Sequence, residues 1–144
     1  MTIFNRSDCK KFCILLAITL VYVFPIILAN VPYIDDLERT ISGVGTDWKV
    51  DFRPLSWLLT EGLNFGEPLT DPAPLMLICG LIVLTGGITY FGKRYFNEYG
   101  SRSSILILAT GLLCPFMLEN YSYHYEAFFM LAGPGFLFTL FALK

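Results

Sequence analysis

Four apolar segments constrain what this chain can fold into more than any other feature. They cover about residues 12–29, 72–91, 104–118 and 127–143, and none contains Asp, Glu, Lys, Arg or His. A helix that crosses a bilayer needs about 20 apolar residues, with a range of roughly 17 to 25. Three segments meet this length. The third, 104–118, is marginal, and it is consistent with a short tilted or a re-entrant span.

The composition agrees with a chain that lies largely in lipid. Hydrophobic residues make up 55% of the sequence and charged residues 15%, whereas soluble domains carry about 25% charged residues. The net charge of −2 leaves no overall basic surface for nucleic acid, so we expect no nucleic-acid partner. The predicted fold is an all-α polytopic membrane protein. We expect one membrane domain, residues 1–144, with about four transmembrane helices plus interfacial helices in a periplasmic loop.

The positive charges predict the orientation. The first segment is longer than the apolar part of a signal peptide, and Ile27 breaks the small-residue pattern before Ala29, so we interpret it as an uncleaved anchor. If all four segments span with the N-terminus inside, seven of the ten Lys and Arg residues are cytoplasmic, as the positive-inside pattern requires. We therefore expect a multi-pass protein of the bacterial inner membrane, with cytoplasmic loop 92–103 and periplasmic loops 30–71 and 119–126.

The long periplasmic loop carries an unusual concentration of charge just after the first apolar segment, in "NVPYIDDLERT". A short helix is expected after Pro32, with Asp35 or Asp36 as its N-cap and Glu38 at a spacing similar to a capping box. A second helix is expected within 52–66, where leucines form an apolar stripe suited to the membrane interface. Capping and solvation are one explanation of these charges.

Catalysis is the other explanation. Sugar transfer from a lipid phosphate requires a carboxylate that takes the proton of the acceptor hydroxyl. Negative charge stabilises the cationic sugar in the transition state, and a cation stabilises the departing phosphate. The two periplasmic loops supply such groups: Asp35, Asp36, Arg39, Arg53, Glu119, His124 and Glu126. One histidine with scattered acids forms no metal site by spacing, so no metal ligands and no cofactor are predicted, although paired aspartates are also compatible with a divalent cation.

Three longer segments resemble a known family. "ILANVPYIDDLERTISG", "DFRPLSWLLTEGLNFGEPLTDPAPL" and "CPFMLENYSYHYEAFFML" are similar to bacterial and prophage glucosyltransferases that modify O-antigen and convert the serotype. In these Gtr-type enzymes an "IDD" after the first span, an "RPL" followed by "FG-PL-D", and a "LENYSY" occur in this order. The resemblance covers nearly the whole chain, but members of the family are considerably longer. It therefore implies the N-terminal portion of such an enzyme, either as a fragment or as a truncated copy.

The resemblance implies an enzyme similar to GT-C glycosyltransferases, with its active site on the periplasmic side. The donor would be undecaprenyl-phosphate-glucose and the acceptor a sugar of the O-antigen of lipopolysaccharide. A flippase for the lipid-linked glucose and a bactoprenol glucosyltransferase would be functional partners. An Asp of the first external loop commonly acts as the base in such enzymes, which implies Asp35 or Asp36 as catalytic. The implied substrate-binding residues are Glu38, Arg39, Arg53, Glu119, Tyr123 and His124.

Two alternatives stay open at the level of the sequence. One is a non-catalytic small membrane protein or remnant, such as a phage-encoded binding or exclusion factor. The other is a subunit of a transporter or flippase, which would carry ionisable residues inside its spans. The apolar segments contain none, so the sequence disfavours the transporter. It leaves open whether these 144 residues catalyse transfer by themselves.

Overall fold

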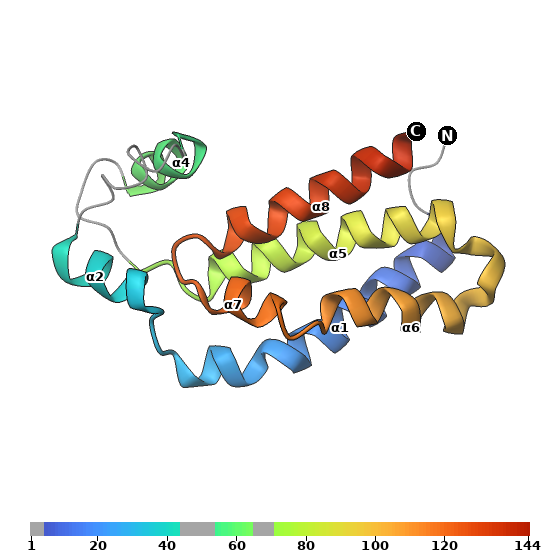
Figure 1. Cartoon of the computed structure of the whole chain (residues 1–144), viewed down its shortest axis with the longest axis horizontal. Coiled ribbons are helices and arrows are strands. Elements are labelled where there is room, and N and C mark those ends of the chain that lie inside the picture. The colour runs from blue at the N-terminus through green and yellow to red at the C-terminus, as the bar shows by residue number, and fades with distance from the viewer. Residues whose placement is uncertain (1–4, 44–53, 65–70) are drawn as a thin grey trace.

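The computed structural model describes residues 5–43, 54–64 and 71–144, without the side chains at 35, 55, 59, 63 and 64. The described residues form helices joined by turns, and no strand occurs among them. Three long helices, α1, α5 and α8, run along the length of the molecule, and α2 and α4 lie at one end (Figure 1). The start of α1 and the end of α8 lie at the opposite end (Figure 1). The predicted all-α fold is thus confirmed in the described part of the chain.

Helix α1 (Arg6–Ala29) begins six residues earlier than the predicted segment 12–29. A capping box explains the earlier start: the Asp8 N–H donates to Asn5 Oδ1 at 2.9 Å, and the Asn5 N–H donates to Asp8 Oδ2 at 3.0 Å. The predicted end at Ala29 is confirmed. Asn30 follows in a left-handed conformation (φ 45°), which asparagine tolerates better than most residues, and its N–H closes the last turn.

Among the described elements, helices α5 (Leu75–Tyr95) and α8 (Ala127–Leu143) make the most extensive contact with each other. Glycines allow their backbones to touch. A Cβ added to Gly87 would overlap the carbonyl oxygen of Gly135, and one added to Gly135 would lie 2.8 Å from the carbonyl oxygen of Val83. Such close approach at small residues is the usual way in which apolar helices associate inside a membrane.

The third apolar segment, 104–118, for which we expected a short tilted or a re-entrant span, is divided between two helices. Helix α6 (Gly100–Leu112) ends in a turn, and α7 (Met117–Ser122) follows it. Pro115 supplies the reason, because it lacks an N–H and disfavours the helical conformation at the residue before it. The Tyr121 hydroxyl donates to the Leu112 carbonyl at 2.7 Å, which satisfies one acceptor that the end of α6 leaves open.

The two helices expected in the first loop are present, as α2 (Ile34–Ser42) and α4 (Pro54–Asn64). The predicted cap of the first is wrong. Helix α2 begins at Ile34 with Tyr33 as N-cap and without a side-chain cap hydrogen bond, so Asp35 and Asp36 lie inside the helix. Glu38 is exposed and forms no capping box. The Asp36 side chain is directed instead toward the second loop, as described below.

Two of the described helices, α1 and α5, are long and apolar enough to cross a membrane. Helix α8 is equally apolar but has 17 residues, and α6 has 13. The bounds of α8 are those predicted for the fourth segment, and α5 is shifted by a few residues from the predicted 72–91. The predicted number of four transmembrane helices stays a prediction, because the structure has two helices of sufficient length and hydropathy among its described residues.

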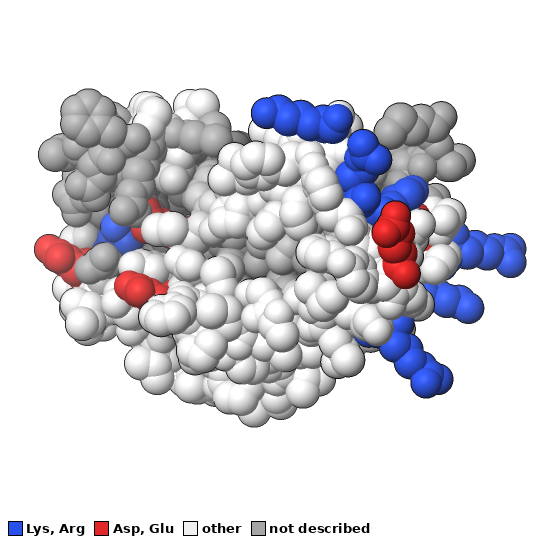
Figure 2. Space-filling view, turned by 45° about the vertical axis from the view of Figure 1, so that its right-hand side comes forward, with Lys and Arg blue, Asp and Glu red and all other residues white. Residues whose placement is uncertain are grey.

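The antiparallel order of the helices gathers basic residues at one end of the molecule. The start of α1, the end of α5, the 3₁₀ helix η1 (Asn97–Tyr99), the start of α6 and the end of α8 all lie there (Figure 1). Figure 2 shows many Lys and Arg side chains at this end of the visible face, with a broad surface free of charged residues beside it. The basic residues on these elements are Arg6, Lys10, Lys11, Lys93, Arg94, Arg102 and Lys144.

Candidate functional site

The two predicted periplasmic loops meet through the carboxylate of Asp36. The backbone N–H of His124 donates to Asp36 Oδ2 at 2.8 Å, across 88 positions of sequence. The Asp36 residue is fully buried and His124 is 8% exposed. A hydrogen bond to a charged acceptor contributes more than one between neutral groups, typically about 1.5 to 3 kcal/mol. Asp36 therefore connects α2 to the turn that precedes α8.

Arg39 lies between two carboxylates in the same buried region. Its Nη1 is 3.6 Å from Asp36 Oδ1 and 4.0 Å from Glu126 Oε2. The exposed fractions of Arg39 and Glu126 are only 6% and 2%. Ions this far from water are tolerated only when they are paired. The three groups form a minus–plus–minus arrangement at the end of the molecule opposite the basic residues.

The pKa of Asp36 is raised above its usual value of 3.8. Burial is the largest cause, because it disfavours the charged form. The His124 backbone N–H and the charge of His124, then the Tyr125 backbone N–H and the Arg39 guanidinium, oppose the shift without cancelling it. Asp36 thus holds its proton to a higher pH than an exposed aspartate does, which is a common property of groups that move protons at a site.

The ring of His124 connects a third segment to the cluster. Its Nδ1 lies 2.8 Å from Oδ2 of Asp71, which is four positions before the first residue of α5. An ionised carboxylate only accepts hydrogen bonds, so Nδ1 carries the proton in this pair. The Asp71 side chain is 36% exposed, so this pair lies at the edge of the buried region.

Tyrosine and threonine side chains form further contacts between the same two loops. The Tyr33 hydroxyl donates to Glu119 Oε1 at 3.2 Å, and the rings of Tyr33 and Tyr123 lie 4.8 Å apart. The hydroxyls of Thr40 and Tyr125 lie 3.2 Å apart. Each of these contacts joins the α2 region to the α7–α8 region. The tyrosines therefore act here as part of the connection between the loops.

A small cavity borders His124 and Tyr123 between the end of α1 and the start of α5, with Asn30 and Pro74 on its walls. Its volume is about 30 Å³, which is enough for a water molecule and too little for a sugar ring.

The structure brings Asp36, Arg39 and His124 together, and it places Glu119 and Tyr123 beside them at the surface. Glu38 is exposed. The side chain of Asp35 and the whole of Arg53 lie outside the described residues. The catalytic and binding roles predicted for all eight residues therefore stay predictions.

The sequence analysis assigned no site role to Asp71, Tyr33 or Tyr125, although Asp71 is the last residue of the "FG-PL-D" pattern. A further signal for Asp71 is its place in "TDPAP", where a lone carboxylate precedes two prolines at the start of an apolar segment. Tyr33 and Tyr125 are indistinguishable in the sequence from the other tyrosines near the membrane segments. Glu126 was counted among the acids of the second loop, but not as a binding residue.

Within residues 5–43, 54–64 and 71–144, no group of three or more His, Cys, Asp or Glu side chains has the geometry to hold a metal ion.

No protein-family model matches the chain, and no solved structure is similar to it. A protein of Salmonella phage P22, described as an uncharacterized 55.3 kDa protein in the gtrB 5′ region, is 32% identical to it over 127 residues. The match covers 88% of this chain and 26% of the phage protein. The chain therefore spans about a quarter of the length of this relative.

Proposed function

We propose that this chain acts in phage-directed modification of O-antigen, as the membrane-embedded part of a glucosyltransferase that works on the periplasmic face. It would accept glucose from undecaprenyl-phosphate-glucose and transfer it to a sugar of the O-antigen repeat of lipopolysaccharide. A bactoprenol glucosyltransferase would make this donor and a flippase would present it. The similarity to a protein from the gtrB 5′ region of a phage supports this setting.

The observation that carries the proposal is the buried cluster of Asp36, Arg39, His124 and Glu126. Helix α2 and the turn before α8, which carry these residues, lie at the end of the molecule opposite the basic residues (Figure 1). With the basic end in the cytoplasm, as the positive-inside pattern favours, the cluster is periplasmic and level with the ends of the apolar helices. The proposed topology is a multi-pass inner-membrane protein with a cytoplasmic N-terminus. A lipid-linked sugar would meet the protein at this level.

The proposed reaction joins the acceptor hydroxyl oxygen to C1 of glucose. The bond from C1 to the phosphate oxygen breaks, and undecaprenyl phosphate leaves with the bonding electrons. The hydroxyl proton passes to a carboxylate of Asp35 or Asp36. A cation near the phosphate, Arg39 or Arg53, stabilises the charge of the leaving group. Glu38, Glu119, Tyr123 and His124 are the proposed contacts to the two sugars.

The burial of Asp36 divides the roles of the two aspartates. A general base has to reach the proton that it removes, and Asp36 is fully buried and occupied with His124 and Arg39. We therefore assign Asp36 as the residue that positions the first loop. Asp35, its immediate neighbour in α2, is the proposed base.

The test is to express the chain in a host that makes undecaprenyl-phosphate-glucose and O-antigen but lacks the transferase. Mass spectrometry of the O-antigen repeat then measures glucosylation. The proposal predicts repeats that carry one additional hexose. An unmodified O-antigen, with the protein correctly inserted in the membrane, would favour the alternative of a non-catalytic membrane protein.

A further inference from the structure

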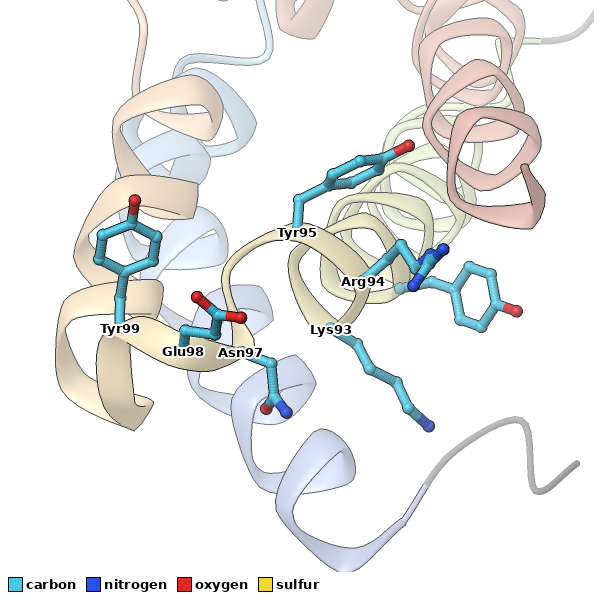
Figure 3. Close-up of a pocket in the computed structure, with 7 residues that line it drawn as sticks. Lys93, Arg94, Tyr95, Asn97, Glu98 and Tyr99 are labelled. Carbon is cyan, nitrogen blue, oxygen red and sulfur yellow. The ribbon is translucent and has the colours of Figure 1, made fainter.

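The basic end of the molecule carries a pocket that the proposed transfer does not use. The turn from α5 into η1 encloses about 510 Å³ that is open to solvent. Figure 3 shows Lys93 and Arg94 leaving the last turn of α5, with Glu98 on the neighbouring η1 turn. The labelled side chains around the pocket are Lys93, Arg94, Tyr95, Asn97, Glu98 and Tyr99.

The two cations of the pocket are in different situations. Lys93 Nζ lies 3.0 Å from Asp8 Oδ2, so this pair holds the end of α5 against the start of α1. Arg94 is exposed, and it makes no ion pair or hydrogen bond with any residue that the structure describes. Its guanidinium is therefore available to a ligand. Guanidinium groups bind phosphate oxygens through two parallel hydrogen bonds.

The tyrosines mark the level at which a ligand would lie. The Tyr95 hydroxyl donates to the Phe141 carbonyl at 3.0 Å, which ties the end of α5 to the end of α8. Tyr99 is 61% exposed on the other side of the turn. Tyrosine is enriched where apolar helices leave the bilayer, because its ring prefers lipid and its hydroxyl prefers water. The pocket thus lies at the level of the lipid headgroups if α1 and α5 cross the membrane.

We propose that this pocket binds the phosphate group of an anionic lipid headgroup, with Arg94 donating to the phosphate oxygens. Lys93 adds positive charge beside it, and the other basic residues of this end attract the anionic leaflet. The carboxylate of Glu98 opposes a bound anion and lowers the affinity. The inference uses the proposed placement in a bilayer, and it is independent of glucosyl transfer.

Native mass spectrometry of the purified chain in detergent tests the proposal, with phosphatidylglycerol as the anionic lipid and phosphatidylcholine as the neutral one. The chain is expected to retain phosphatidylglycerol preferentially. Arg94→Gln is expected to weaken this binding about five-fold, the effect of one basic residue at an anionic surface. Glu98→Gln is expected to strengthen it. Arg102→Gln is the matched control, because Arg102 is exposed at the same end and does not line the pocket.

An equal loss of lipid affinity in the Arg94 and Arg102 variants would overturn the proposal. It would indicate that all the basic residues of this end attract the lipid together and that the pocket contributes no specific binding. A separate titration with inorganic phosphate distinguishes the source of the phosphate. Competition by inorganic phosphate at concentrations similar to those of the lipid would overturn the assignment to a lipid. Arg94 is exposed, so unchanged helicity by circular dichroism is expected for its variant.

Discussion

The two ends of this molecule use charge in different ways. At the basic end Arg6, Arg94 and Arg102 are exposed to solvent, although Asp8 and Lys11 in α1 are buried there. At the other end Asp36, Arg39 and Glu126 are almost completely buried. Exposed charges contribute little to stability, typically less than about 1 kcal/mol for each pair. Buried charges are costly unless they are paired, so their positions are strictly determined by their partners.

The difference separates two tasks. The exposed cations are suited to setting the orientation in a membrane, which depends on the number of positive charges and requires no fixed geometry, and only the proposed phosphate contact of Arg94 depends on a pocket. The buried cluster requires fixed geometry, because it joins α2, the segment before α5 and the α7–α8 turn at one place. A reaction that depends on positions within fractions of an ångström needs such a connection.

The largest expected effect comes from removing the cation of the buried cluster. Arg39→Met would leave the carboxylates of Asp36 and Glu126 without their common partner. Breaking a buried ion pair in this way typically costs about 3 to 5 kcal/mol. Thermal and denaturant unfolding in detergent would measure the loss. Arg6→Gln, at the exposed basic end, is the control, and an effect within about 0.5 kcal/mol is expected for it. An equal loss of unfolding free energy in the two variants would contradict the proposed difference between the buried cluster and the exposed basic end.

The contact between α5 and α8 connects the two ends, and adjacent glycines allow a matched test of it. In Gly87→Ala the new methyl group would overlap the Gly135 backbone, whereas the Cβ in Gly86→Ala would have its nearest neighbour 4.0 Å away. Forced repacking typically costs about 1 to 3 kcal/mol, and a backbone that cannot move aside raises the cost further. The same unfolding assay should show a loss for Gly87→Ala alone. A loss of equal size in both variants would argue against this helix contact.

The buried cluster should also make stability depend on pH. Burial raises the pKa of Asp36, so the folded chain keeps this proton at a pH where the unfolded chain, with a pKa of about 3.9, has released it. The resulting stabilisation is complete below that pH, and it is lost as the pH rises toward the raised pKa. Comparing wild type with Asp36→Asn isolates this contribution. The unfolding free energy of the wild type minus that of Asp36→Asn should fall as the pH rises from about 4. If this difference rises with pH instead, the result would contradict the burial of Asp36.

The smallest expected effect is at the surface of the same end. Tyr33→Phe removes the hydrogen bond to Glu119, which is exposed, and keeps the ring beside Tyr123. Exposed substitutions of this kind usually change stability by about 0.5 kcal/mol or less. A change above about 1 kcal/mol in the unfolding assay would show that the buried cluster extends to Glu119 and Tyr123.

Much of the fold could be predicted because polar residues delimit its apolar segments. Glu126 and Lys144 border α8, and its bounds were predicted without error. The start of α1 was missed because its first turn is charged, and the Asn5–Asp8 capping box makes that turn helical. The position of the break after α6 was not predicted, because hydropathy does not register the backbone effect of Pro115.

The candidate site could be predicted only in its local part. Asp36 and Arg39 lie three positions apart on one helix, so their proximity follows from helix geometry. The pairing of Asp36 with His124 spans 88 positions, and that of Asp71 with His124 spans 53. Such contacts depend on how α5, α7 and α8 pack, and no local pattern encodes them.

The most direct test of the central claim compares glucosylation by the Asp35→Asn and Asp36→Asn variants in the host described above, at equal amounts of membrane-inserted protein. Loss of a general base typically slows a reaction about 10² to 10⁴-fold. Asp35→Asn should lose activity to this extent without loss of stability, whereas Asp36→Asn should lose activity together with the pH-dependent stability of the cluster. Glu61→Gln, an exposed change in α4, is the control and should remain active. Full activity in both aspartate variants would contradict the proposed role of this loop in the transfer.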